Sequence, residues 1–110
     1  MADPDAEQRK VARLRAVLAQ DPDDEVALFA LGKASLKRKD YHEAITALER
    51  CVRVKPDYSA AYQALAVALY KAGEVERSIE IGRKGVEVSS ARGDLMVTNQ
   101  LRHFLGQIGE

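Results

Sequence analysis

The sequence of 110 residues has few of the residues from which disulfides and metal centres are built, and it has no excess of charge of either sign. Its single cysteine, Cys51, cannot form an internal disulfide, and only His42 and His103 are present to join it in a zinc site. The 17 basic residues balance the 17 acidic ones, so the molecule as a whole has no field that attracts nucleic acid or a membrane surface. We therefore expect no metal and no cofactor, and any electrostatic preference must be local.

Long apolar runs are also missing. Met1 is followed by acidic residues, which argues against a secretory signal peptide, and no apolar run approaches the length of a membrane span. Hydrophobic residues nevertheless make up 46% of the chain, which is enough to bury a core in one domain of this length. We expect a single cytoplasmic domain over residues 1–110 that does not bind a membrane.

Two segments of the chain match each other after a shift of 34 residues, which aligns Leu31 with Leu65. The N-terminal segment joins the same register through Val11, which aligns with Ile45. A period of this length is typical of stacked helical arrays, in which each unit leaves an apolar face that its neighbour covers. The pattern predicts two full units preceded by a half unit.

Within each unit the apolar residues fall at helical spacing, and turn signals separate the helices. The first unit turns at Asp40, whose spacing to Glu43 resembles a capping box at the start of the next helix. In the second unit Gly73 suits the left-handed residue that ends a helix. Pro22 and Pro56 are expected to end the outer helices. These signals predict antiparallel helix pairs.

In sequence order, the first unit contains a bulky residue, a Leu-Gly pair, an Asp-Tyr turn, small residues on either side of a large one, and a closing proline. The residues are Leu28, Leu31, Gly32, Asp40, Tyr41, Ala44, Leu48, Cys51 and Pro56. This pattern resembles the tetratricopeptide repeat, with residues 25–58 as the first repeat and residues 59–92 as the second. The second repeat departs from it at Gly82 and Gly85, each of which weakens a helix by up to about 1 kcal/mol relative to Ala. We expect that helix to pack loosely or to admit a close neighbour.

The resemblance implies an all-α fold: a right-handed superhelical array of antiparallel helix pairs, or α-solenoid, of about six helices. A half repeat over residues 4–20 precedes the two repeats. After Gly93 the repeat signature is lost, yet apolar residues such as Val97 and Leu101 still mark one helix face. We therefore expect a capping helix over residues 94–108, with Asp94 as its N-cap.

The basic cluster formed by Lys37, Arg38 and Lys39 lies at the end of a predicted helix and in the turn after it. Cations there complement the negative end of the helix dipole and meet water. A nucleic-acid interface would instead repeat basic residues down one face with aromatic residues between them. The second repeat offers only Lys71 at the equivalent place, so a nucleic-acid adaptor is a less favoured alternative.

Catalysis also has little support in the sequence. The two histidines and Cys51 form no nucleophile and base pair that the sequence recommends, so an enzyme is a less favoured alternative as well. The acidic run over residues 21–25 lacks the glycine and the distant glutamate of a calcium-binding loop. It is interpreted as a helix start, with Asp23 or Asp24 as the N-cap.

In tetratricopeptide proteins the first helix of each pair lines a concave groove. Carried over by repeat position, the groove residues here are Val26, Phe29, Lys33, Leu36, Lys37, Gln63, Val67, Tyr70 and Lys71. The resemblance implies an apolar floor with a positive edge that prefers acidic segments. Alternatively, some of these side chains pack under the terminal helices. Some family members hold a carboxylate with a Lys-Asn-Asn-Lys-Arg set, but Phe29 and Ala64 stand at two of those places, which argues against a full clamp.

These observations favour a non-enzymatic scaffold that binds a peptide or helix of another protein in the groove. The runner-up is self-association, because two repeats make a short array and Leu95 and Met96 fall off the main apolar face of the last helix. We expect a monomer or a weak homodimer.

Overall fold

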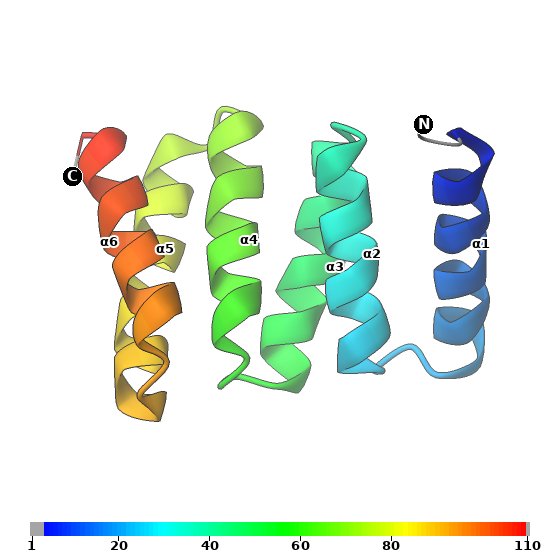
Figure 1. Ribbon diagram of the computed structural model, residues 1–110, viewed down its shortest axis with the longest axis horizontal. Coiled ribbons are helices and arrows are strands. Elements are labelled where there is room, and N and C mark those ends of the chain that lie inside the picture. Colours follow the sequence, from blue (N-terminus) through cyan, green and yellow to red (C-terminus); the bar gives the residue numbers. More distant parts are fainter. Residues whose placement is uncertain (1–3, 110) are drawn as a thin grey trace.

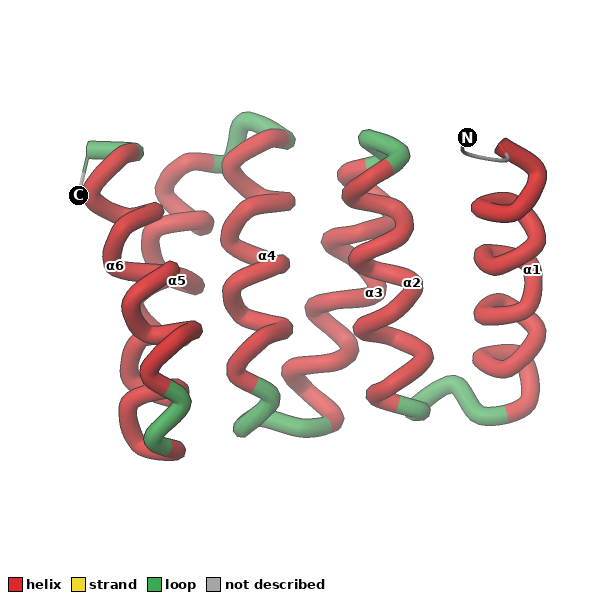
Figure 2. The backbone as a smooth tube through the Cα atoms, in the orientation of Figure 1, coloured by secondary structure: helices red, strands yellow, loops and turns green. Residues whose placement is uncertain are grey.

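The computed structural model describes residues 4–109, which fold into six helices. These are α1 (Pro4–Gln20), α2 (Glu25–Lys37), α3 (Tyr41–Val54), α4 (Ser59–Lys71), α5 (Val75–Arg92) and α6 (Leu95–Gln107). Helices α2, α4 and α6 form one layer, here called the inner layer, with α3 and α5 behind them and α1 at one end (Figure 1). Figure 2 shows that short turns join the helices throughout the described part of the chain. The expected all-α array of about six helices is confirmed.

Aspartates begin the two helices of the first repeat. The carboxylate of Asp24 accepts a hydrogen bond from the amide of Ala27 at 2.9 Å, so Asp24 is the N-cap of α2 and Asp23 is not. Asp40 accepts from the amide of Glu43 at 3.2 Å and begins α3 in the same way. Both caps satisfy amides that have no partner inside the helix.

The side chain of Glu43 does not complete the expected capping box. Its carboxylate accepts hydrogen bonds of 2.7 Å from Ser35 on α2 and from Arg15 on α1, while the amide of Asp40 donates to the Ser35 carbonyl. Burial alone would raise the pKa of Glu43, but these hydrogen bonds and the charge of Arg15 hold that pKa below its usual value. Glu43 therefore joins three helices rather than one helix start.

The turns at the ends of α2, α4 and α5 each use a residue in the left-handed region. Gly73, which was expected there, has φ 87°, and Gly93 has φ 74°. The first repeat places Lys39 at the same point with φ 65°. A side chain in this conformation is strained, whereas glycine adopts it without strain.

The predicted N-cap Asp94 stands at the start of α6, but its side chain makes no cap hydrogen bond. The carboxylate instead accepts from the Ser59 hydroxyl at 2.8 Å, which ties the start of α6 to the start of α4. Asp94 is thus the N-cap residue of α6, as predicted, but its side chain joins two helices instead of satisfying the first amides of α6.

The core lies between the two layers, and its small-residue columns are fully buried. Ala44, Leu48 and Cys51 of α3 all have 0% exposure. The thiol of Cys51 donates to the carbonyl of Glu25 at 3.6 Å. Burial, with a smaller effect from the charge of Glu25, raises the pKa of Cys51 to about 11. Cys51, which stands in a small-residue position of the repeat pattern, is therefore a core residue.

The glycines of α5 admit close neighbours. A Cβ atom at Gly85 would lie 2.7 Å from Cδ1 of Leu101 on α6 and 2.8 Å from Cβ of Tyr62 on α4. A Cβ atom at Gly82 would lie 2.8 Å from Cδ2 of Leu105. This helix was expected either to pack loosely or to admit a close neighbour, and the second expectation is correct.

Helix α6 takes the place of a third inner helix. It contacts α5 and α4, as α4 contacts α3 and α2 (Figure 1). The hydroxyls of Ser89 on α5 and Thr98 on α6 share a hydrogen bond of 2.6 Å at the centre of this contact. The last helix therefore covers the second repeat, as expected of a cap, and also extends the inner layer.

Candidate functional site

Several of the predicted groove residues lie on the face of the inner layer that points away from α3 and α5. On α2, Val26, Lys33 and Lys37 share one side at helical spacing, and that side does not include Gly32, the residue that faces Leu48 of α3. All three are exposed, and 65% of Val26 is accessible to solvent. This apolar side chain and the two lysines form the accessible part of α2.

Helix α4 continues the same face with Val67 and Lys71, which are half-buried and exposed, respectively. Ala64, about one turn before Val67 on α4, is buried. Lys71 makes no ion pair or hydrogen bond within residues 4–109 other than those of its helix backbone. It is the lysine of this face with the fewest competing contacts.

The remaining predicted groove residues lie at the junctions between inner helices. The ring of Phe29 lies 5.0 Å from that of Tyr58, centroid to centroid, and the ring of Tyr70 meets Phe104 of α6 edge-on at 5.9 Å. Leu36 packs against the core, and Gln63 is half-buried. Aromatic pairs of this kind stabilise a fold by about 0.5–1.5 kcal/mol beyond their buried area. These side chains therefore help to hold neighbouring repeats together, although Tyr70 keeps 43% of its surface exposed.

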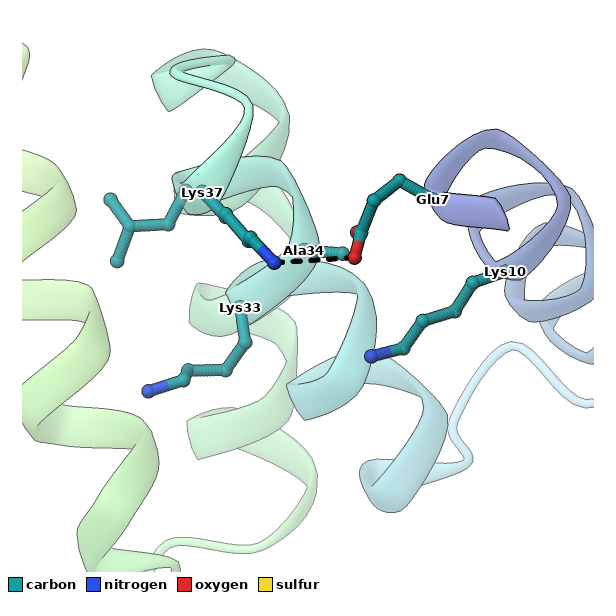
Figure 3. A pocket seen from close by; sticks show the side chains of 6 residues that line it. Glu7, Lys10, Lys33, Ala34 and Lys37 are labelled. Atoms are coloured by element: carbon teal, nitrogen blue, oxygen red, sulfur yellow. Dashed lines mark hydrogen bonds and ion pairs between the residues drawn. The ribbon is translucent and has the colours of Figure 1, made fainter. Parts of the chain in front are cut away.

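The positive edge of the groove is partly neutralised. The ammonium group of Lys37 lies 3.3 Å from the carboxylate of Glu7 on α1 (Figure 3). Lys33 is turned toward α4, and its ammonium group lies 6.0 Å from the centre of the Phe29 ring. Both lysines line a pocket of about 430 Å³ between α1 and α2.

Helix α6 adds exposed side chains beside the predicted groove, and the sequence analysis did not include them. Met96, Gln100, His103 and Gln107 are exposed and lie at helical spacing next to Phe104, the residue that faces α4. The signal was present in the sequence. The buried residues Val97, Leu101 and Leu105 match Ala61, Leu65 and Leu69 of α4 after a shift two residues longer than the repeat.

Groups that could support chemistry are not gathered in the described chain. No set of three His, Cys, Asp or Glu side chains within residues 4–109 is placed to hold a metal ion. His42 and His103 are exposed on different helices, and the buried thiol of Cys51 stays protonated at neutral pH. No helix among these residues is both long enough and apolar enough to span a bilayer.

Comparison with known proteins agrees with this architecture. The model of the tetratricopeptide repeat family matches residues 11–50 and 29–92. The TPR repeat-containing protein PA0015 of Pseudomonas aeruginosa is 30% identical over 95 residues, which are 86% of this chain and 90% of that protein.

Solved structures share the fold over most of the chain. The solution structure of protein BPP2914 from Bordetella parapertussis has a TM-score of 0.78 at 27% identity and covers 98% of this chain and 89% of its own. A tetratricopeptide repeat domain protein from Salinibacter ruber has a TM-score of 0.73 at 24% identity, over 81% of this chain and 90% of its own. The fold generally mediates protein–protein interaction, and its proteins are typically not enzymes. The chain belongs to the tetratricopeptide repeat family.

Proposed function

We propose that the protein is a scaffold that binds a peptide or a helix of a partner protein across α2, α4 and α6. One observation supports this most strongly: the accessible side chains of the inner layer combine apolar groups, such as Val26 and Tyr70, with lysines on one face. Apolar side chains on a rigid surface provide anchor contacts, and lysines orient an acidic segment. Because two repeats and one further helix offer limited area, we expect micromolar affinity, or about −8 kcal/mol.

Site-specific photocrosslinking in the source cells tests this proposal. A photoreactive residue placed at Val67 or Lys71 on the groove face should capture a partner. The same residue at Thr46 or Glu80, which are exposed on the outer helices, should not. Capture only from α3 and α5, in particular around His42 and Arg77, would contradict the proposal.

Variants of exposed groove residues test the energetics once a partner has been purified. Val26→Ala should weaken binding by about 1 kcal/mol through the loss of an apolar contact. Lys71→Glu should chiefly slow association with an acidic segment, and more so at low salt. Lys55→Glu, an exposed charge change in the loop after α3, is the matched control. Equal effects of the two lysine variants would argue against an electrostatic role for the groove.

Self-association is a second candidate, supported by two adjacent apolar residues at the start of α6. Leu95 and Met96 are 65% and 71% exposed. Sedimentation at several concentrations decides between the candidates, with Asn99→Glu as the control for Met96→Glu. A stable dimer that only Met96→Glu dissociates would favour self-association, whereas a monomer at all concentrations would exclude it.

A further inference from the structure

Helix α1 has an unpartnered flank in the described structure. The outer helix α3 contacts two inner helices, α2 and α4, and α5 likewise contacts α4 and α6. Helix α1 stands at the end of the array and, among residues 4–109, packs only against α2, apart from the ion pair of Arg15 with Glu43 of α3 (Figure 1). The side of α1 that corresponds to the contact of α3 with α2 therefore has no helix of residues 4–109 packed on it.

The repeat register identifies the residues on this flank. Lys10, Leu14 and Val17 of α1 align with Ala44, Leu48 and Cys51 of α3, which are fully buried at the contact with α2. In α1 the three residues share one face at helical spacing, but Val17 is 43% exposed, Lys10 is exposed and Leu14 is only partly buried. Because Leu14 also packs against the core, the accessible part of the flank consists of Val17, the uncovered edge of Leu14 and a cation where α3 has a small residue.

The pocket of about 430 Å³ adjoins this flank. It is lined by Glu7, Lys10, Lys33, Ala34, Leu36 and Lys37. Figure 3 shows Lys10 reaching from α1 toward α2, and it has no ion pair within residues 4–109. The lining holds three lysines and one carboxylate, which pairs with Lys37, so its charge is positive.

We propose that this site, called the α1 slot and defined by Lys10, Leu14, Val17, Lys33 and Lys37, binds an acidic amphipathic helix of a partner protein. The helix lies in the position that an inner helix takes beside α3 and α5. Its apolar stripe covers Leu14 and Val17, as facing helices do elsewhere in the array. Its carboxylates pair with Lys10 and compete with Glu7 for Lys37.

The charge of the slot selects this occupant. An uncharged helix packed closely on α1 would bury the ammonium group of Lys10 without a partner, which is unfavourable. A carboxylate of the bound helix beside Lys10 provides that partner. The slot shares Lys33 and Lys37 with the α2 end of the groove. Its occupation needs no contact with α4 or α6, so it does not depend on the proposed groove function.

Synthetic peptides test the slot directly. The probe is a fluorescent, alanine-rich peptide of about 18 residues, long enough to form helix in water, with leucines on one stripe and glutamates beside it. The matched peptide carries glutamine at every glutamate. Anisotropy titrations measure affinity for the full chain, and amide chemical shifts locate the contact. We expect saturable binding of the glutamate peptide, shifts at Leu14 and Val17, and about tenfold weaker binding of the glutamine peptide.

Two variants should change the affinity in opposite directions. Lys10→Glu should weaken binding of the glutamate peptide about tenfold, and Glu7→Gln should strengthen it about threefold because Lys37 loses its internal partner. Lys55→Glu, far along the chain from the slot, should leave the affinity unchanged. Circular dichroism verifies that each variant is folded.

Three results would overturn the slot: no saturable binding, equal affinity for the two peptides, or an affinity unchanged by Lys10→Glu. Chemical-shift changes confined to α4 and α6, together with weaker binding by Lys71→Glu, would also overturn it while supporting the groove. Binding that Lys10→Glu weakens and Lys71→Glu does not alter would support the slot whatever the photocrosslinking experiment shows for the groove.

Discussion

Replacing Gly85 by alanine should destabilise the protein, although alanine favours a helix. The helix preference of alanine contributes up to about 1 kcal/mol to stability. Against it stands the added Cβ atom, 2.7 Å from Cδ1 of Leu101 and 2.8 Å from Cβ of Tyr62. Leu101 is fully buried, and the Cβ atom of Tyr62 can move only with the backbone of α4. Overpacking of this kind costs about 1–3 kcal/mol, so we expect a net loss of up to about 2 kcal/mol.

Two other helical glycines are matched controls for the same substitution. Gly106 on α6 has no neighbouring atom within 4 Å of an added Cβ, so Gly106→Ala should stabilise by up to about 1 kcal/mol. At Gly82 the close atom is the end of the Leu105 side chain, which can rotate, so Gly82→Ala should be nearly neutral. The unfolding free energy should thus decrease in Gly85→Ala, stay nearly the same in Gly82→Ala and increase in Gly106→Ala.

Urea and thermal unfolding followed by helix circular dichroism measure these differences. In a domain of this size, 1 kcal/mol corresponds to a change of about 4 °C in Tm. If Gly85→Ala were as stable as Gly106→Ala, α5 could move away from α4 and α6 without loss. The reasoning from close contacts would then be refuted.

Three further predictions concern the first repeat. Lys39→Gly should raise the unfolding free energy by about 1 kcal/mol because it removes the strain of φ 65°, whereas Arg38→Gly, at φ −80°, should not; equal effects in urea unfolding would contradict this. Ala44→Leu should lower Tm through overpacking of about 1–3 kcal/mol at a fully buried site, and an unchanged Tm would show that the repeat register is wrong. Cys51 should react with thiol reagents only as fast as the protein unfolds. The thiol has a pKa of about 9 in the unfolded chain and about 11 in the folded protein. The unfolding free energy should therefore decrease as the pH rises from about 9 to about 11, and this decrease should be smaller in Cys51→Ala, which lacks the thiol.

Local signals in the sequence were sufficient to predict the helices and their ends. Asp24 and Asp40 cap α2 and α3 because a short acceptor side chain at that place satisfies the first amides of a helix. Gly73 ends α4 because the turn requires a positive φ. The period also identified Ala44 and Cys51 as core residues, since residues at helical spacing on one face share the same burial.

The contacts of individual side chains were decided by the tertiary structure. The spacing of Glu43 from Asp40 predicted a return hydrogen bond to the backbone, but the hydroxyl of Ser35 and the guanidinium of Arg15 lie within reach and bind it instead. Phe29 and Tyr70 were expected to form an apolar floor. Each has an aromatic neighbour from the next inner helix or its start, because the inner helices stand close enough for ring contact.

The sequence by itself determined which residues form helices and which face of each helix is buried, because both depend on spacing along the chain. The arrangement of neighbours was decided only in three dimensions. Helix α5 has 18 residues where α3 has 14, and its glycines let α6 approach closely, so α6 enters the inner layer despite its shifted register. The same stacking leaves α1 packed mainly on α2, with a pocket between the two helices. A periodic pattern specifies that a face must be covered, whereas distances between helices decide what covers it.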